Sequence, residues 1–163
     1  MLTDHQDADR QDTDRQDIGW ALDPVLERDT VPLGDLPLCR VLLNRDANYP
    51  WLLLVPRRPG AVETTDLDTA GQAQLMVEIA QASRALKALT GCDKINMAAI
   101  GNVVSQLHVH IIARTHQDAA WPKPVWNAVP PRDYDAAARD ALIGALRQRL
   151  VLSPSAGATG HAL

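Results

Sequence analysis

The sequence predicts an α+β domain: a mostly antiparallel sheet of about five strands, with a long central helix and a C-terminal helix on one face. Two observations predict this class. Short apolar runs occur in pairs separated by turn-forming residues, as in β-hairpins, and one helical pattern lies between the pairs while another follows them. Grouped strands of this kind, which do not alternate strictly with helices, are typical of helices packed on an antiparallel sheet.

The N-terminal third is expected to form a short helix and then a hairpin. The helix is predicted within residues 18–26, because Pro24 stands where a proline can open a helix. The hairpin strands are residues 38–44 (LCRVLLN) and 51–55 (WLLLV), and residues 45–48 (RDAN) between them favour a turn. The prolines that follow the second strand end it, since proline has no backbone N–H for strand pairing.

The central segment predicts a long amphipathic helix, with Asp66 as its N-cap and Gly91 as its C-terminal stop. Apolar residues recur there at steps of three and four, which places them on one face. The expected apolar face carries Leu75, Met76, Ile79, Ala82, Leu86 and Leu89. The expected polar face carries Glu78, Gln81, Arg84 and Lys87.

A second hairpin is expected from residues 94–100 and 106–114, joined around Gly101 and Asn102. A second amphipathic helix is predicted from about residue 133 to residue 150. The apolar side of this last helix carries Leu142, Leu146, Leu150 and Val151.

With 163 residues, 46% of them hydrophobic, the chain has the composition of a single compact domain, which we place at residues 18–152. Residues 1–17 are expected to form a disordered acidic tail, and residues 153–163 a flexible one. The acidic tail holds six aspartates and two arginines, which account for the whole net charge of -4. The rest is neutral overall, so no basic patch suggests a nucleic-acid polymer as partner.

The cysteines and the apolar runs indicate the cellular compartment in which the protein is expected. Cys39 and Cys92 lie in unrelated contexts, and we expect both to be buried, reduced thiols. No segment reaches the ~18 consecutive apolar residues of a membrane span, and the N-terminus does not have the pattern of a signal peptide. A cytoplasmic protein without a membrane partner is therefore expected.

The segment QLHVHIIAR, residues 106–114, carries the chemistry. Alternate side chains of a strand point to opposite faces, so three polar side chains share one face: Gln106, His108 and His110. The other face is apolar and consists of Leu107, Val109 and Ile111. Three neighbouring groups that form hydrogen bonds suit a ligand with several oxygens, and a phosphate is the natural candidate.

Histidine provides two functions at a phosphate. A neutral imidazole, with an ordinary pKa of ~6.5, can attack phosphorus, and a second imidazole can hold or transfer protons. Two other interpretations of the pair stay open. The histidines could be plain surface residues, or they could chelate a metal with a third ligand from Asp118 or His116, although Arg114 beside them disfavours a cation.

Residues 106–114 resemble the signature strand of the histidine triad (HIT) superfamily, usually His-x-His-x-His followed by apolar residues. Three further segments agree with the resemblance. Residues 51–58 (WLLLVPRR) look like the family's strand ending in a Val/Ile-Pro-Lys/Arg turn, and residues 101–105 (GNVVS) take the place of its Gly-Gln segment. Residues 120–122 (AWP) resemble a Trp-Pro element of some members. The similarity covers roughly residues 38–126.

The resemblance implies a homodimeric nucleotide hydrolase or nucleotidyl transferase that attacks the α-phosphate of a nucleoside phosphoramidate, dinucleoside polyphosphate or related ester, without cofactor or metal. His108 matches the family's nucleophile, and His110 matches the third motif histidine, which contacts phosphate and manages protons. Asn102 matches a phosphate-binding Gln of the family, in the same segment as Ser105, and Asn44 lies near the family's ribose-binding position.

The chain departs from the motif at Gln106, which replaces the first histidine and cannot titrate. This replacement keeps a second function open, that of a nucleotide-binding or regulatory module with weakened catalysis. A metal-dependent enzyme built on the His-x-His pair is the third, less favoured hypothesis.

Overall fold

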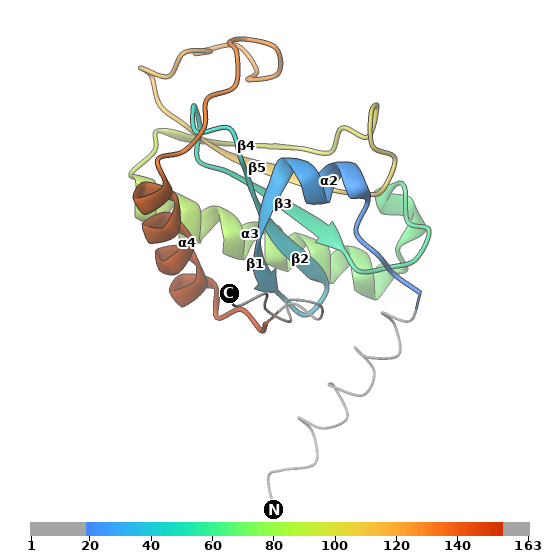
Figure 1. The fold of residues 1–163 in the computed structure, drawn as a ribbon. Helices are drawn as coiled ribbons and strands as arrows, with labels where there is room; N and C mark the ends of the chain where they lie inside the picture. Colours follow the sequence, from blue (N-terminus) through green and yellow to red (C-terminus); the bar gives the residue numbers. More distant parts are fainter. Residues whose placement is uncertain (1–18, 155–163) are drawn as a thin grey trace, which may run out of the picture.

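The computed structural model describes residues 19–154, so the expected tail at 1–17 and residues 155–163 of the other expected tail lie outside the described residues. Figure 1 shows a sheet with helices on both sides. In chain order, the elements are α2 (Pro24–Asp29), β1 (Thr30–Asp35), β2 (Cys39–Asn44), β3 (Trp51–Pro56), the 3-10 helix η1 (Thr64–Asp66), α3 (Thr69–Thr90), β4 (Lys94–Ala98), β5 (Val109–Arg114) and α4 (Ala136–Leu150).

The five strands form one antiparallel sheet in the order β1-β2-β3-β5-β4, which confirms the predicted α+β class. Both predicted hairpins are present as β2-β3 and β4-β5. The two hairpins join through β3 and β5, where Leu53 pairs with His110. This pairing brings the first hairpin alongside the histidine segment.

Strand β1 was not predicted, because it contains Pro32 and Gly34, two residues that weaken a strand pattern. It is an edge strand, where a proline is tolerated, and its register shifts between these two residues. Gly34 has φ +149°, and a Cβ there would lie 2.7 Å from the backbone oxygen of Ser153. Ser153 exchanges two backbone hydrogen bonds with Asp35, so the described chain stays attached to the sheet edge at this point.

The long helix α3 begins two residues later than predicted. The Asp68 side chain accepts a hydrogen bond from Gly71 N at 2.7 Å and is the N-cap. Asp66, the predicted cap, accepts instead from the backbone N–H groups of Val62 and Glu63, and so closes the preceding turn. Gly91 ends the helix at φ +64°, as predicted.

One face of the sheet is covered by α3 and α4, and their apolar side chains pack against the inward residues of the strands. At two positions of α3, burial is the opposite of what the helical pattern predicts. Glu78 is fully buried, and its carboxylate accepts from the backbone N–H groups of Leu38 and Cys39, at 2.7 and 2.9 Å. Met76, expected in the core, is 57% exposed. Both cysteines are free and buried, as expected.

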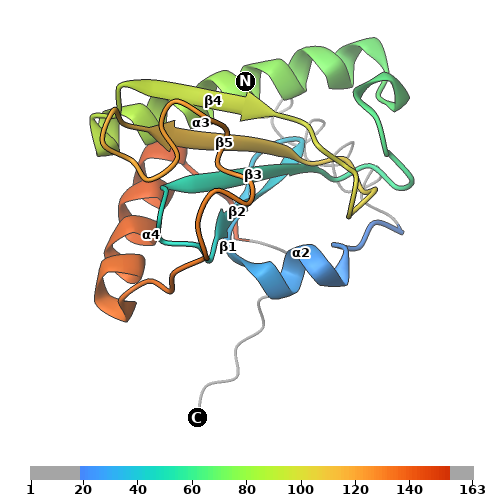
Figure 2. The same cartoon turned by 90° about the horizontal axis from the view of Figure 1, so that it is seen from above.

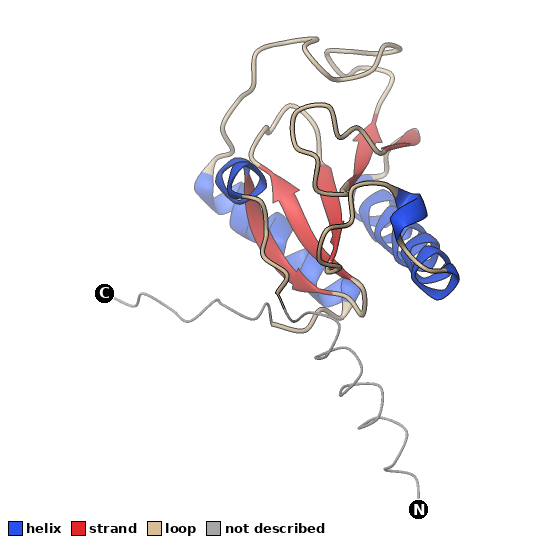
Figure 3. Cartoon of the chain, turned by 90° about the vertical axis from the view of Figure 1, so that its right-hand side faces the viewer, coloured by secondary structure: helices blue, strands red, loops and turns tan. Residues whose placement is uncertain are grey.

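The opposite face carries a second apolar cluster, so the helices are not all on one side. Figures 2 and 3 show the sheet between α2 on one side and α3 on the other. Helix α2 contributes Leu26, and loop 115–131, orange in Figure 1, contributes Ala120 and Val125. These residues pack against the outward side chains of β2, β3 and β5, among them Leu42, Leu53 and Ile112.

The strands of the second hairpin are shorter than predicted. Strand β4 ends at Ala98 instead of Ile100, and β5 begins at Val109 instead of Gln106. Gln106 and His108 therefore lie in the segment that leads into β5. Helix α4 begins at Ala136, with Asp135 as N-cap, and not near residue 133. Among the described residues, no helix has the length and hydropathy that crossing a membrane requires.

Candidate active site

His108 and His110 lie side by side on the sheet face opposite α3. The alternation predicted from the sequence is present, since Leu107, Val109 and Ile111 enter the cluster beneath α3. Each histidine is 6% exposed, and their rings meet edge to face with centroids 4.8 Å apart. The two imidazoles therefore form one unit that is largely excluded from water.

The hydrogen bonds fix the protonated nitrogen of His108. Its Nδ1 lies 2.7 Å from the backbone oxygen of Gln106. A carbonyl oxygen only accepts, so Nδ1 must carry the hydrogen and donate it. In the neutral ring, Nε2 then holds the free lone pair, which is the form of imidazole that attacks an electrophile.

His110 is held in the complementary form. The indole Nε1–H of Trp51 donates to Nδ1 of His110 at 3.0 Å. An indole N–H only donates, so Nδ1 of His110 is the acceptor and the ring hydrogen lies on Nε2. The two imidazoles thus present different groups: Nε2 of His108 has a free lone pair, and Nε2 of His110 carries a hydrogen that it can donate.

The pKa of His110 is lowered from 6.5 to about 4, first by burial and then by the nearby His108. Its neighbours explain this direction. Its register partners are Leu53 on β3 and Ala98 on β4, and the rings of Trp51 and Trp126 pack edge to face against it. No carboxylate among them favours an imidazolium, so His110 is neutral at pH 7.

Trp126 forms a wall of the site through its edge-to-face contacts with Trp51, at 5.5 Å, and with His110, at 5.3 Å. The loop that carries Trp126 begins where β5 ends. Arg114, the last residue of β5, is 1% exposed and binds the carboxylate of Asp118 through two hydrogen bonds. It also donates to the backbone oxygen of Lys123 at 2.9 Å, so it holds the loop at two points.

The Gln106 side chain binds the N-terminal segment. Its Oε1 accepts from the backbone N of Asp23 at 2.9 Å, and its Nε2 donates to the backbone oxygen of Ala21 at 2.8 Å. Both ends of the amide are occupied. The Gln106 side chain therefore attaches residues 21–23 to the histidine segment. Only the backbone oxygen of Gln106 forms a hydrogen bond with His108.

The other predicted nucleotide-binding residues are placed in two regions. Asn102 and Ser105 are exposed in the loop that precedes the histidines. Asn44 ends β2, two strands from β5, and by alternation with Leu42 it lies on the histidine face. Its Oδ1 accepts from the backbone N of Asp46 at 2.8 Å.

The two additional ligands considered for a metal site have other partners. The carboxylate of Asp118 binds Arg114, and the ring of His116 lies 2.8 Å from the carboxylate of Asp93. Within residues 19–154, no three His, Cys, Asp or Glu side chains gather closely enough to hold a metal ion.

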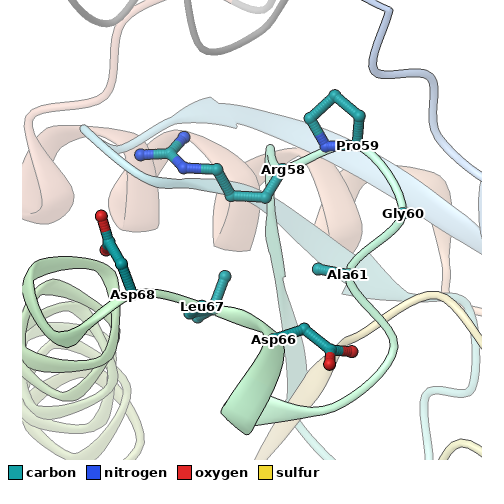
Figure 4. Close-up of a pocket in the computed structure, with 7 residues that line it drawn as sticks. All are labelled: Arg58, Pro59, Gly60, Ala61, Asp66, Leu67 and Asp68. Carbon is teal, nitrogen blue, oxygen red and sulfur yellow. The ribbon is translucent and has the colours of Figure 1, made fainter.

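A surface pocket of about 510 Å³ lies at the start of α3, between residues 58–61 and 66–68 (Figure 4). Ala61 and Leu67, which line it, belong to the apolar cluster beneath α3, on the face opposite the histidines. Figure 4 shows Asp66 and Asp68 on opposite sides of Leu67. Both carboxylates accept backbone hydrogen bonds, so this pocket offers no paired acid and base.

Two residues at the histidines were not assigned to the site from the sequence, namely Trp51 and Trp126. A signal for Trp51 was present, since residues 51, 53 and 55 alternate onto one face of β3 in the same way as the histidines do in their segment. No local pattern signals Trp126, because its position depends on the buried ion pair that holds its loop.

Comparisons with known proteins agree with this fold. The profile of the HIT domain family matches residues 25–117. A histidine triad protein from Bradyrhizobium japonicum is 60% identical over 80% of this chain and 98% of its own, with a TM-score of 0.80. A histidine triad protein from Marinobacter aquaeolei is 40% identical over 81% of this chain and 96% of its own, with a TM-score of 0.79. A histidine triad protein from Sinorhizobium meliloti is 39% identical over 82% of this chain and 98% of its own, also with a TM-score of 0.79. No curated protein sequence matches the chain significantly.

Proposed function

The chain belongs to the HIT domain family, whose members are nucleotide-binding hydrolases and transferases, and from this premise we propose that it cleaves a nucleotide substrate at its α-phosphate. The substrate is a nucleoside phosphoramidate, a dinucleoside polyphosphate or a related ester. Its nucleotidyl group is transferred to His108 and then to water or another acceptor.

One observation carries the proposal: the hydrogen bond from Nδ1 of His108 to the backbone oxygen of Gln106, at 2.7 Å. It directs the lone pair of Nε2 away from the backbone, and the carbonyl oxygen stabilises the positive charge that the ring acquires when Nε2 bonds to phosphorus. A histidine that only packed in an apolar cluster would not need this tautomer.

His110 is proposed to bind the phosphate through its Nε2–H, since Nδ1 is occupied by Trp51. The donor lies beside the nucleophile, so it can stabilise the charge that gathers on the phosphate oxygens during attack. Asn102 and Ser105, in the loop before the histidines, are proposed to contact the phosphate, and Asn44 the ribose.

The test is to trap the intermediate. The protein is mixed with adenosine and guanosine phosphoramidates and dinucleoside polyphosphates that carry ³²P at the α-phosphate, quenched in alkali and assayed for an acid-labile nucleotidyl-histidine. We expect label on the wild type and none on His108→Asn. His116→Asn is the matched control, because His116 is exposed and pairs with Asp93. Label that persists in His108→Asn would disprove the assigned nucleophile.

The second candidate function, nucleotide binding without turnover, is favoured by the position of Gln106. Its amide is occupied by Ala21 and Asp23 and provides no titrating group to the histidines. Titration calorimetry that detects nucleotide binding, together with no label on His108, would favour this candidate.

A homodimer is also part of the proposal. Strand β4 is an edge of the sheet, and the chain there exposes Met97, Ile100 and Val103 at 52, 38 and 92%. An open edge with apolar side chains favours pairing with a second chain. Sedimentation should give a dimer for the wild type at micromolar concentration and a monomer for Met97→Lys, with Val62→Lys as the control on another exposed residue. A monomeric wild type would contradict this part.

A further inference from the structure

From the hydrogen bonds around the two histidines, we infer that the site selects substrates whose leaving group departs as a stable anion. Nucleotide anhydrides, with a P–O–P linkage, would be cleaved well, and phosphoramidates of alkyl amines and alkyl esters would be cleaved poorly. The inference rests on the proposed function, because it concerns the same attack by His108 on the α-phosphorus.

The chemistry of the first step sets the requirement. The lone pair on Nε2 of His108 forms the new P–N bond, while the bond from phosphorus to the leaving atom breaks and its electron pair stays on that atom. A phosphate group can carry this pair without a proton. An alkyl amide or alkoxide is far more basic, so such a group must receive a proton from a general acid as it departs.

In the second step, water forms a P–O bond, the electrons of the P–N bond return to Nε2 of His108, and the proton of water passes to solvent. A nucleoside monophosphate is released. This step needs no acid for the leaving group, because the leaving group is the imidazole itself. Only the first step therefore requires a general acid.

Among the described residues, His110 packs its ring against that of the nucleophile, and its hydrogen bonds prevent it from serving as that acid. The indole of Trp51 donates to Nδ1 at 3.0 Å, so a second proton on this nitrogen would face an N–H group. The proton on Nε2 belongs to a neutral imidazole, which is an extremely weak acid. His110 can donate a hydrogen bond, but it cannot transfer a proton at neutral pH.

The other polar groups that the structure describes here, namely those of Gln106, His108 and Arg114, do not provide this general acid either. The amide of Gln106 cannot titrate and is occupied by the backbone of Ala21 and Asp23. The proton on Nδ1 of His108 is held by a carbonyl oxygen. Arg114, the charged residue at the end of the same strand, is buried in its ion pair with Asp118.

The surroundings of His110 support the same conclusion. Leu53 and Ala98 lie beside it in the sheet, and Trp51 and Trp126 pack on its ring. Among these contacts, only the one with His108 involves a titratable side chain. Burial and His108 together lower its pKa to about 4, so the imidazolium is scarce at pH 7. Trp51 is thus a positioning residue that determines specificity through His110.

The test compares leaving groups on one nucleotide. The value of kcat/KM is measured at pH 7 for p-nitrophenyl, p-chlorophenyl and phenyl esters of AMP, for diadenosine tetraphosphate and for an alkyl phosphoramidate of AMP. General acid catalysis contributes about 10²–10⁴-fold where it operates, so we expect the phosphoramidate to be cleaved at least ~100-fold more slowly than the anhydride. The esters should slow steeply as the leaving phenol becomes more basic.

Trp51→Phe tests whether Trp51 causes the dependence of the rate on the leaving group. It keeps an aromatic ring but removes the N–H, so Nδ1 of His110 becomes free to bind a proton. We expect the dependence on the leaving group to become shallower at pH 6, with a relative gain for the phosphoramidate. Trp20→Phe is the matched control, because the indole N–H of Trp20 makes no hydrogen bond within the described residues, so the hydrogen bond of Trp51 is kept and the dependence should not change.

A second readout does not depend on turnover. Imidazole ¹⁵N shifts of His110 should show the hydrogen on Nε2 from pH 5 to pH 8 in the wild type, and protonation at a higher pH in Trp51→Phe. A wild-type His110 that titrates above pH 6, or a phosphoramidate cleaved as fast as the anhydride, would overturn the inference and leave the proposed function intact. If no substrate is cleaved and His108 is not labelled, the proposed function itself fails, and the inference with it.

Discussion

The guanidinium of Arg114 and the carboxylate of Asp118 form a two-point ion pair, with N–O distances of 2.7 and 3.0 Å, between the end of β5 and loop 115–131. Asp118 also accepts from the backbone N–H groups of Thr115 and Ala120. Burial alone would raise the pKa of Asp118, but these hydrogen bonds outweigh it and the pKa is lowered. The pair therefore connects the strand of the histidines with the loop of Trp126.

We predict that Asp118→Asn destabilises the protein by about 3–5 kcal/mol, because it leaves the buried charge of Arg114 without its counterion. The free energy of unfolding in urea measures the loss. The control is Asp140→Asn, which removes an exposed pair with Arg139 and should cost less than about 1 kcal/mol. Equal effects of the two substitutions would contradict the structural role of Arg114.

A second prediction concerns pH and His110. Its pKa is lowered in the folded protein to about 4, while the unfolded chain keeps the ordinary value of 6.5. Between these values the unfolded state binds more protons, so folding stability falls as the pH decreases from 6.5 toward 4. This histidine should account for about 2 kcal/mol of the stability lost between pH 7 and pH 5.

Urea unfolding of His110→Asn at pH 7, 6 and 5 measures that contribution. The variant should show a smaller decrease over this range than the wild type, whatever its stability at pH 7. His116→Asn serves as the control, since this histidine is exposed. A decrease of the same size in His110→Asn and in the wild type would show that His110 is not held neutral.

A third prediction concerns Gln106, whose amide makes two hydrogen bonds to residues 21–23. Gln106→Leu removes both, and each is worth about 1 kcal/mol. Amide hydrogen exchange at Asp23 should become at least ~10-fold faster, because its N–H loses its acceptor. Ser105→Ala, an adjacent exposed position, should leave this exchange rate unchanged. Equal protection in Gln106→Leu would mean that other contacts hold the segment.

Local patterns predicted much of the fold and the two histidines. Alternation correctly placed His108 and His110 opposite Leu107 and Val109, because successive side chains point to opposite faces in β5 and in the segment that leads into it. Both hairpins and the Gly91 helix end were predicted for the same reason, since they depend on residues that are near in sequence.

Contacts between distant residues escaped prediction. Trp51 and His110 are 59 positions apart, and Gln106 and Asp23 are 83 apart, so no window of sequence contains either pair. Gln106 looked like a third site residue because its direction in the segment was predictable, whereas its partner was not. The sequence therefore predicted that His108 and His110 share one face, and the structure was needed to find which nitrogen of each ring carries the proton.

The helix α3 illustrates the same limit at a single position, because Glu78 follows the helical pattern of a polar residue and is nevertheless fully buried. Its two oxygens accept from the backbone N–H groups of Leu38 and Cys39, and Gln74 donates to the first oxygen at 2.8 Å. A carboxylate suits this place because both of its oxygens accept hydrogen bonds.

We predict that Glu78→Gln destabilises the fold by about 2–3 kcal/mol, because the new NH2 group must face either the N–H of Cys39 or the N–H groups of Leu38 and Gln74. Glu27→Gln, on the exposed surface of α2, should change stability by less than about 0.5 kcal/mol. Urea unfolding measures both. A Glu78→Gln protein as stable as the wild type would show that the start of β2 does not depend on a pure acceptor.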